Sequence, residues 1–520
     1  MPECTTHEIT SEVPFTGQLI SPLPDTDFRA YLEEVDKLIQ FTPKIIDEIN
    51  KDLDTHGLIK KRWRLEDREF HESQTTELTG FDLPERDLTL DRITLGVGRP
   101  RMSGYVVLVF MMLRGYLGSL TSKPARRFIL ESISLHEFLQ RHSLEMPGFT
   151  TMLENVNAVS SATRDLIMDW QIKLVIKEGL DDFKALTIDS TAVKANSGWP
   201  TDGKILTDLL GRAHRLGQRL HIFGLKDFRK GCLPRWLDEI SGLEFQICLS
   251  AGKPRSRAKM KKNYRKLLDK STKAADSLAR ELKGIKEGLD TETLPPSRRE
   301  ILLQTLARLG SDIEDAKRVI DYARDRVLHD KSLPSTEKIL SISDSSAAYI
   351  KKGGRDAVIG FKPQLVRSEN GFVTSLIVPE GNAADSIKLK PAIEDAIRRT
   401  GVIAQLVSTD DGYASAAGRD ALLRMGVKDV SISGAKGKNL TPPEDWESDK
   451  YRDARRNRSA VESLMFTIKD GFEFGELGRR GINAVREELT EKVLAYNCCR
   501  IILIRQRCKK QREEEMKGAA

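Results

Sequence analysis

The chain has 520 residues, of which 39% are hydrophobic and 31% are charged, and its formal net charge is +7. This length predicts two to four domains with sizeable cores, as in an ordinary globular protein. The mild basic excess is only weak evidence for a polyanionic partner, so local clustering of charge has to decide that question.

Cysteine usage and hydropathy exclude several classes of protein. The six cysteines show no Cys-x-x-Cys spacing, so we expect reduced thiols in the cytosol, neither a disulfide framework nor a zinc site. The N-terminus lacks a basic segment followed by an apolar one, so no signal peptide is expected. The most apolar run, residues 102–113, is shorter than the ~20 residues of a membrane span. It predicts a buried core helix, no membrane contact and a cytoplasmic location.

Residues 1–175 have apolar positions at helical spacing, with Thr42-Pro43 marking the start of a new helix. Residues 132–148 predict a short helix, a turn and another helix. This N-terminal domain is either a DNA-binding helix-turn-helix domain or a plain helical bundle, and the sequence does not decide between them. In the first case the candidate phosphate contacts are Arg99, Arg101, Arg126 and Arg127.

Residues 183–191 have the pattern of a short strand that ends in an acid, Asp189. An aspartate at the end of a buried strand is costly unless something neutralises it. The alternative is that Asp189 only caps the following turn.

Residues 216–335 predict a basic helical insertion. Apolar residues at spacings of three and four lie on both sides of Leu294-Pro295-Pro296, which predicts an antiparallel helical hairpin with a coiled-coil seam. A dense basic run precedes it. A solvated face would intersperse both signs of charge, so we prefer nucleic-acid contact for this run. Its members are Lys253, Arg255, Arg257, Lys259, Lys261, Lys262, Arg265 and Lys266.

Strand patterns return after Pro334. Residues 357–362 and 371–378 predict a hairpin around Asn370-Gly371. An amphipathic helix over 383–400 and a buried strand over 402–409 follow, and this strand ends in Asp410-Asp411. The remaining predicted elements are a helix through Leu423, a strand over 427–433 and a helix over 484–507.

Residues 455–469 predict one amphipathic helix with a single acid among basic residues on one face. The sequence leaves open whether that acid belongs to a solvated ion-pair ladder or is a metal ligand beside phosphate-binding cations. The charged face consists of Arg455, Arg458, Glu462 and Lys469, and the adjoining apolar face of Val461, Leu464, Met465 and Ile468.

Without the insertion, the element order is that of a ribonuclease-H-like α/β domain, which residues 176–215 and 336–515 would form. Such a domain brings two strand ends and one helix together, and with them Asp189, Asp410 and Glu462. Two carboxylates about 4 Å apart repel by roughly 4 kcal/mol at a dielectric constant of 20, so three require cations. Mg²⁺ suits this oxygen-rich set, and two such ions can support an in-line phosphodiester displacement.

The motifs Thr187-Ile188-Asp189-Ser190-Thr191 and Ser408-Thr409-Asp410-Asp411-Gly412-Tyr413, with the Arg458, Glu462 and Lys469 spacing, together resemble the DDE transposases of bacterial insertion sequences. The third motif is similar to the Tyr-x2-Arg-x3-Glu-x6-Lys signature of one branch. Arg455 stands where that signature has Tyr, and the nearest tyrosine is Tyr451. The family pattern Asp-x-Gly-Tyr favours Asp410 over Asp411 as the ligand.

The resemblance implies a transposase that binds terminal inverted repeats and catalyses metal-dependent DNA strand cleavage and strand transfer. The cofactor would be Mg²⁺, with two ions expected and Mn²⁺ as a substitute, and the partners would be double-stranded DNA and a second copy in a synaptic assembly. A cytoplasmic, nucleoid-associated location follows. Asp189, Asp410 and Glu462 would be the catalytic and metal-binding residues, and Arg458, Lys469 and Arg455 would bind phosphate.

Three alternatives remain. A ribonuclease-H-like nuclease without strand transfer would share all three carboxylates, and a DNA-binding protein derived from a transposase would have lost catalysis. A structural coiled-coil protein would explain only the hairpin. For Trp199 and Trp446 we expect core packing rather than stacking on a displaced base.

Overall fold

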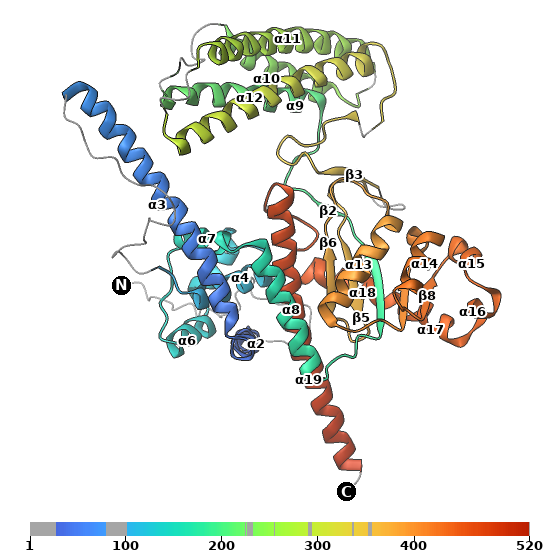
Figure 1. Ribbon diagram of the computed structural model, residues 1–520. Helices are drawn as coiled ribbons and strands as arrows, with labels where there is room; N and C mark the ends of the chain where they lie inside the picture. The colour runs from blue at the N-terminus through green and yellow to red at the C-terminus, as the bar shows by residue number, and fades with distance from the viewer. Residues whose placement is uncertain are drawn as a thin grey trace, which may run out of the picture. The chain divides into compact units, whose positions relative to one another are not determined.

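The computed structural model describes residues 28–79, 101–223, 225, 232–253, 255–289, 294–334, 337–351 and 356–518. The fold is mixed α/β and 68% helical. The chain divides into two compact units (Figure 1). Unit 1 comprises Met1–Leu53, Arg99–Asn196 and Ile350–Ala520, and unit 2 comprises Asp54–Gly98 and Ser197–Tyr349.

The N-terminal region is helical, as predicted. The predicted helix start at Thr42-Pro43 is confirmed, because α2 ends at Phe41 and α3 begins at Lys44. Short helices also lie on either side of the predicted turn around residue 147. The helices are α2 (Phe28–Phe41), α3 (Lys44–Thr79), α4 (Gly104–Leu117), α5 (Lys123–Glu131), α6 (Ile133–Arg141), α7 (Phe149–Ala158) and α8 (Ser161–Lys177).

Helix α4 contains the most apolar run of the chain, and it is the buried core helix that the sequence predicts. The Ser103 side chain caps its N-terminus by accepting from the Val106 amide, and Gly118 ends it in a left-handed conformation with φ 70°. None of the helices in the described residues is long and apolar enough to cross a membrane. The cysteines of these residues are free thiols, while Cys4 lies outside them.

A five-stranded sheet forms the centre of the C-terminal part of unit 1, in the order β6-β5-β1-β7-β8. Strand β1 pairs antiparallel with β5 and parallel with β7, and β7 pairs parallel with β8. Parallel neighbours place their carboxyl ends at the same edge of the sheet. The strands are β1 (Ala185–Ser190), β5 (Gln364–Ser368), β6 (Val373–Ile377), β7 (Leu406–Thr409) and β8 (Asp429–Ile432).

The two faces of this sheet have different helical covers. Leu186 and Ile188 of β1 share a core with α13 (Leu389–Thr400) and α14 (Ala416–Arg424). Because successive side chains of a strand alternate, Thr187 and Asp189 point to the other face. On that face α17 (Asp449–Asn457) contacts β7 and β8, and α18 (Ser459–Gly471) contacts β1.

The predicted hairpin around Asn370-Gly371 exists, but its first strand was predicted wrongly. The partner of β6 is β5, whereas the predicted strand corresponds to β4 (Val358–Phe361), which pairs with β2 (Val193–Lys194) outside the five-stranded sheet. Pro363 separates β4 from β5 and lacks the amide that would continue a ladder. Gly371 turns the hairpin with φ 92°, a conformation that favours glycine.

The single helix predicted over residues 455–469 is two helices, which meet at Arg458. Val461 donates to the Arg458 carbonyl, an i to i+3 bond that marks the break. The two helices contact different strands, so the chain changes direction between them. Arg455 therefore lies on α17 while Glu462 and Lys469 lie on α18. The buried residues of α18 are Val461, Leu464 and Ile468, whereas the predicted Met465 is only half-buried.

Four helices of unit 2 enclose one hydrophobic core. They are α9 (Asp202–Arg219), α10 (Leu233–Ser250), α11 (Arg257–Glu287) and α12 (Pro296–Ala323). Helices α11 and α12 are the predicted antiparallel arms, and their apolar seam is buried. The same seam also packs against α9 and α10. The predicted hairpin is thus half of a four-helix bundle whose apolar face is used within the chain.

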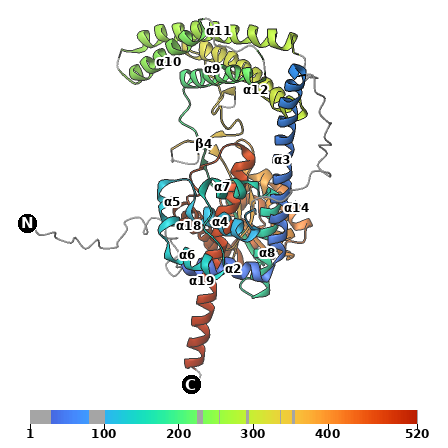
Figure 2. The same ribbon diagram turned by 90° about the vertical axis from the view of Figure 1, so that its left-hand side faces the viewer.

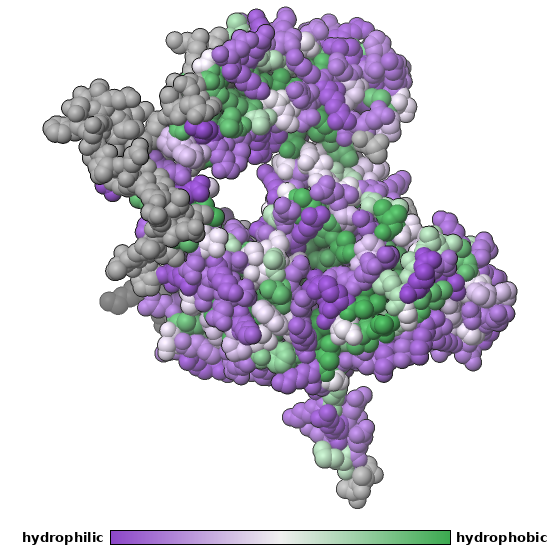
Figure 3. Space-filling model, viewed as in Figure 1, coloured by the Kyte–Doolittle hydropathy of each residue, from purple (hydrophilic) through white to green (hydrophobic). Residues whose placement is uncertain are grey.

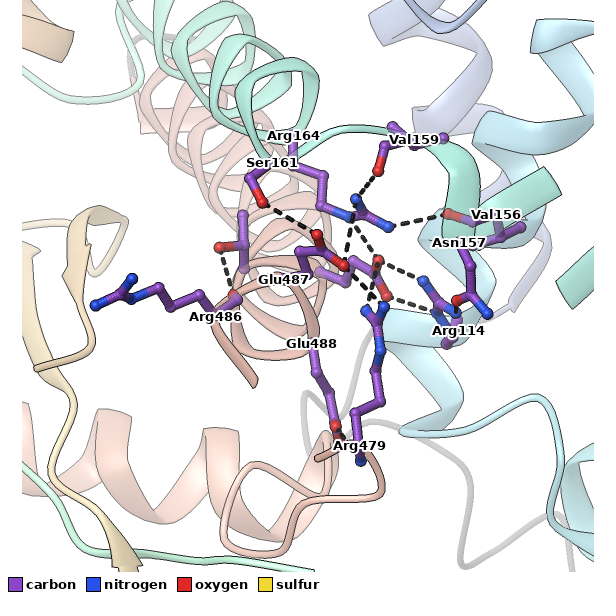
Figure 4. A network of polar contacts seen from close by, with 12 residues as sticks. Arg114, Val156, Asn157, Val159, Ser161, Arg164, Arg479, Arg486, Glu487 and Glu488 are labelled. Atoms are coloured by element: carbon purple, nitrogen blue, oxygen red, sulfur yellow. Dashed lines mark hydrogen bonds and ion pairs between the residues drawn. The ribbon is translucent and has the colours of Figure 1, made fainter. Parts of the chain in front are cut away.

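The longest helix of unit 1, α19 (Ile482–Gly518), packs against α4 and α8 through a buried ionic network (Figure 4). Two arginines bind its Glu491: Arg114 with two bonds of 2.7 and 2.6 Å, and Arg164 with one of 2.7 Å. Burial opposes ionisation, but these two guanidinium groups lower the pKa of Glu491. Arg479 binds the neighbouring Glu487 at 2.7 Å. Figure 2 shows the last turns of α19 extending away from the N-terminal helices.

Candidate functional site

Two aspartates lie side by side at the carboxyl ends of parallel strands β1 and β7. The register pairs Thr187 with Ser408. Asp189 and Asp410 each follow two residues later, so they occupy equivalent positions at this edge of the sheet. The Asp189 carboxylate accepts from the Ser190 amide at 2.6 Å, and the Asp410 carboxylate accepts from the Gly412 amide at 3.0 Å. Asp189 is buried and Asp410 is half-buried.

The pKa of a tyrosine near this pair is raised by the carboxylates around it. Tyr413 is fully buried, and its hydroxyl donates to the Gln364 side chain. Burial raises the pKa of the Tyr413 phenol. Three carboxylates raise this pKa further, namely those of Asp385, Asp189 and Asp410. Three acids therefore lie near one hydroxyl, two of them at the strand ends and the third, Asp385, at the start of the 3-10 helix η4 (Asp385–Lys388).

Asp411, the neighbour of Asp410, has a different environment. Its carboxylate accepts from the backbone amides of Lys436 at 2.9 Å and Gly437 at 3.1 Å, at the start of α15 (Ala435–Leu440). Gly434, with φ 101°, leaves room for it, because a Cβ there would lie 2.7 Å from the Asp411 side chain. Asp411 therefore holds the turn after β8.

Glu462 lies in the first turn of α18, and its side chain is 66% exposed. Its carboxylate pairs with Arg458 of the preceding turn at 3.3 Å. This arrangement is the ion pair that the sequence left open beside the metal-ligand interpretation. Helix α18 itself contacts β1, the strand that carries Asp189.

The other predicted phosphate-binding residues have separate environments. Lys469 of α18 donates to the Ala192 carbonyl at 3.0 Å, which places its ammonium group just beyond the carboxyl end of β1. Arg455 instead stacks on Trp446, 4.2 Å from the ring centroid, and donates to the Trp446 carbonyl. Tyr451 is buried, and its hydroxyl donates to the Val430 carbonyl.

Sequence patterns missed the polar residues on the other side of the site. Asp385, the first residue of the short 3-10 helix η4 before α13, is buried and binds Lys362 at 2.8 Å and the Gln364 amide at 3.0 Å. A Cβ on Gly412 would lie 3.1 Å from Asp410 Oδ1 and 3.2 Å from Asp385 Oδ2, so these two carboxylates flank the same glycine. Sequence patterns placed Asp385 at the start of an amphipathic helix and not at a strand end, so only the fold identifies it as part of this site.

The donor atoms suit a hard divalent cation, because Asp189 and Asp410 present carboxylate oxygens from neighbouring strands. Across the residues that the structure describes, no three His, Cys, Asp or Glu side chains form a group able to hold a metal ion. Glu462 is turned to solvent, and Asp385 is bound by Lys362 and Gln364. Because Mg²⁺ is often held by only one or two carboxylates, the carboxylate oxygens of Asp189 and Asp410 are suitable ligands for it.

The remaining candidates of the sequence analysis lie elsewhere. Arg101 donates to the Asn50 carbonyl, Arg126 lies over the Phe149 ring and Arg127 pairs with Glu131, while Arg99 is outside the described residues. Trp446 is half-buried, and Trp199 is 60% exposed. The prediction that Trp199 packs in a core is therefore wrong.

Residues 324–498 match the family model of the transposase DDE domain. The matched segment is about a third of the chain, and it includes Asp410 and Glu462 but not Asp189. The match supports a DDE transposase, an enzyme acting on DNA. No curated protein and no solved structure matches the chain significantly.

Proposed function

We propose that the protein is a transposase that binds the terminal inverted repeats of its element and catalyses metal-dependent DNA cleavage and strand transfer. The observation that carries this proposal is the parallel pairing of β1 with β7, which aligns Asp189 with Asp410 at one sheet edge. The transposase DDE domain match over residues 324–498 supports it from a separate direction.

We also infer a ribonuclease-H-like fold for the catalytic part. Its support is the strand order: three antiparallel strands, β6, β5 and β1, followed by the parallel strands β7 and β8. Helix α18, which carries Glu462 in its first turn, contacts β1. The sequence predicts a similar order, but with the first strand of the hairpin at residues 357–362 instead of at β5.

In this proposal Asp189, Asp410 and Glu462 hold the divalent metal, and the Glu462 side chain leaves Arg458 to do so. When bound, Mg²⁺ would polarise the scissile phosphate and lower the pKa of the attacking water. Lys469, at the carboxyl end of β1, attracts the phosphate of the cleaved strand, and Arg458 becomes available for the same role. Arg455 acts indirectly by holding Trp446.

The bonds made and broken follow from phosphodiester chemistry. In cleavage, a water oxygen bonds to phosphorus and the bond to the 3′ oxygen breaks, leaving a 3′-hydroxyl and a 5′-phosphate. In strand transfer, that 3′-hydroxyl attacks a target phosphodiester and displaces its 3′ oxygen. Because two ends must react together, we also propose a dimer or larger synaptic assembly.

The test is cleavage and joining of labelled duplexes that carry the flanking element ends, with Mg²⁺ and with Mn²⁺. Asp189→Asn, Asp410→Asn and Glu462→Gln should each keep end binding but lose cleavage and joining by roughly 100-fold or more. Full activity in any of these variants would remove that residue from the catalytic set. Cleavage by the wild type without joining would favour the nuclease alternative.

Asp411→Asn is the matched control for Asp410→Asn, because both change one carboxylate of the same dipeptide. Asp411 contacts backbone amides of α15, so its variant should retain cleavage. Asp470→Asn is the control for Glu462→Gln, since Asp470 is an exposed acid of the same helix. Loss of cleavage in Asp411→Asn with retention in Asp410→Asn would reverse the assignment.

The second candidate is a DNA-binding protein that has lost catalysis. The ion pair between Glu462 and Arg458 favours it, since the third carboxylate is exposed and already paired within its own chain segment. Under this candidate the wild type binds the ends and cuts nothing with either metal.

A further inference from the structure

Helix α11 of unit 2 has a charge composition unlike that of its neighbour. Its 31 residues include 11 Lys and Arg but only 4 Asp and Glu, an excess of seven positive charges. The adjacent α12 has 5 of each sign in 28 residues. A solvated helix face usually mixes both signs, as α12 does.

Five of the eleven positive charges of α11 lie on one narrow face of the helix. At about 100° per residue, five cations fall within an arc of roughly 60°. We call them the α11 stripe: Lys259, Lys262, Lys266, Lys273 and Arg280. All five are exposed, whereas the buried Leu267, Leu268 and Leu278 fall on the opposite side of the helix. The stripe runs from Lys259 to Arg280, a rise of about 32 Å along the helix axis.

The stripe differs from the basic run that the sequence shows. Arg257 and Lys261 of that run both bind Asp330, at 2.7 Å each, and Lys270 binds Glu239 at 2.5 Å. In the stripe, by contrast, no ion pair joins Lys259, Lys262, Lys266 or Lys273 to another described residue. Folding thus separates cations neutralised within the chain from cations presented to solvent.

A groove of about 560 Å³ continues the stripe toward its C-terminal end. Lys273 and Arg280 line it together with Lys283, Lys317 and Trp236. Its one carboxylate, Asp276, pairs with Lys317 at 3.3 Å, so the lining keeps an excess of positive charge. Helix α11 forms an outer layer of the bundle (Figure 1), and Figure 3 shows mostly hydrophilic side chains over this unit.

We propose that the α11 stripe binds the phosphate backbone of duplex DNA without reading its sequence. Its length is close to one turn of B-DNA, roughly 34–36 Å. Lysine presents a point charge that suits phosphate, and backbone contacts carry no sequence information. The proposal rests on the proposed function only in taking DNA as the polyanion, and it does not depend on catalysis.

The test measures binding of the full-length Asp189→Asn protein to a fluorescent 30-base-pair duplex of random sequence, over a series of NaCl concentrations. The stripe variant adds Lys259→Gln, Lys262→Gln, Lys266→Gln and Lys273→Gln. It should bind roughly tenfold or more weakly, and the slope of log K against log salt should fall by about 3 to 4. Because cleavage is disabled in both proteins, the result is independent of whether the wild type is a transposase.

The control variant removes four other exposed lysines, Lys390, Lys509, Lys510 and Lys517, and so makes the same change in net charge. Three of them lie near the acids Glu513, Glu514 and Glu515, and this variant should keep most of the affinity and slope. Equal losses in both variants, unchanged binding in the stripe variant, or binding of duplex RNA in preference to DNA would overturn the proposal. If the quadruple variant misfolds, the pairs Lys259→Gln/Lys262→Gln and Lys266→Gln/Lys273→Gln should each lower the slope by about 2.

Discussion

Cations gather in two regions of this protein, and their surroundings differ. In unit 1, Arg114, Arg164 and Arg479 surround Glu487 and Glu491 between α4, α8 and α19, where nearly every charge has an opposite charge within 4.0 Å. In unit 2, the α11 stripe presents five cations to solvent along one helix face.

The difference is the position of the acids. A buried guanidinium is stable only when carboxylates and carbonyls satisfy it, so the network of α19 joins helices that are far apart in the chain. An exposed cation has no such requirement, and a row of cations without ion pairs repels itself until a polyanion neutralises it. The first region holds the fold together, and the second is available to a partner.

The largest expected effect is in the buried network. Glu491→Gln would leave Arg114 and Arg164 buried without their shared carboxylate, and should lower the free energy of unfolding by about 3–5 kcal/mol. Urea unfolding of the full chain followed by circular dichroism measures this. Glu513→Gln, at an exposed position of the same helix, should change it by less than about 0.5 kcal/mol. A similar small change for Glu491→Gln would show that the network adds little.

Two helical glycines, one in each region, differ in how closely other atoms pack against them. A Cβ at Gly115 of α4 would lie 2.1 Å from the Glu491 carbonyl oxygen, so Gly115→Ala must push α4 from α19 and should cost about 1–3 kcal/mol. A Cβ at Gly284 of α11 would meet no described atom within 4 Å. Gly284→Ala should therefore stabilise unit 2 by roughly 0.5–1 kcal/mol. A shift of the thermal unfolding midpoint in the same direction for both variants would contradict this comparison.

The smallest expected effect tests whether cations outside the α11 stripe can also contact DNA. Lys261 and Arg257 lower the pKa of Asp330 through hydrogen bonds to its carboxylate. Asp330→Asn would release both cations, and asparagine tolerates the φ of 55° at this position. The slope of random-duplex binding against salt should then rise by up to about 2. An unchanged slope would mean that these two cations do not reach the DNA.

Local patterns in the sequence were sufficient for several elements of the fold. The buried helix α4 and the arms α11 and α12 follow from apolar periodicity, because the period of a helix is set within a few residues. The ends of β1 and β7 follow from an apolar run that stops at an acid. These positions identified Asp189 and Asp410 as candidates before their register was known.

Pairings between distant segments could not be predicted in this way. The partner of β6 is β5 rather than β4, and the break at Arg458 arises because α17 and α18 contact different strands. Asp385 reaches the site from the 3-10 helix η4, not from the end of a strand. The sequence grouped Arg455 with Glu462, whereas the fold stacks it on Trp446.

The sequence by itself determined most of the helices, the two strands that end at Asp189 and Asp410, and the basic character of one insertion. Only the tertiary structure decided which charges neutralise one another. It joined Arg114 to Glu491 across 377 residues and bound Arg257 and Lys261 to Asp330, leaving the α11 stripe exposed. The reason is physical: periodicity is a property of neighbouring residues, whereas ion pairing depends on which surfaces meet when the chain folds.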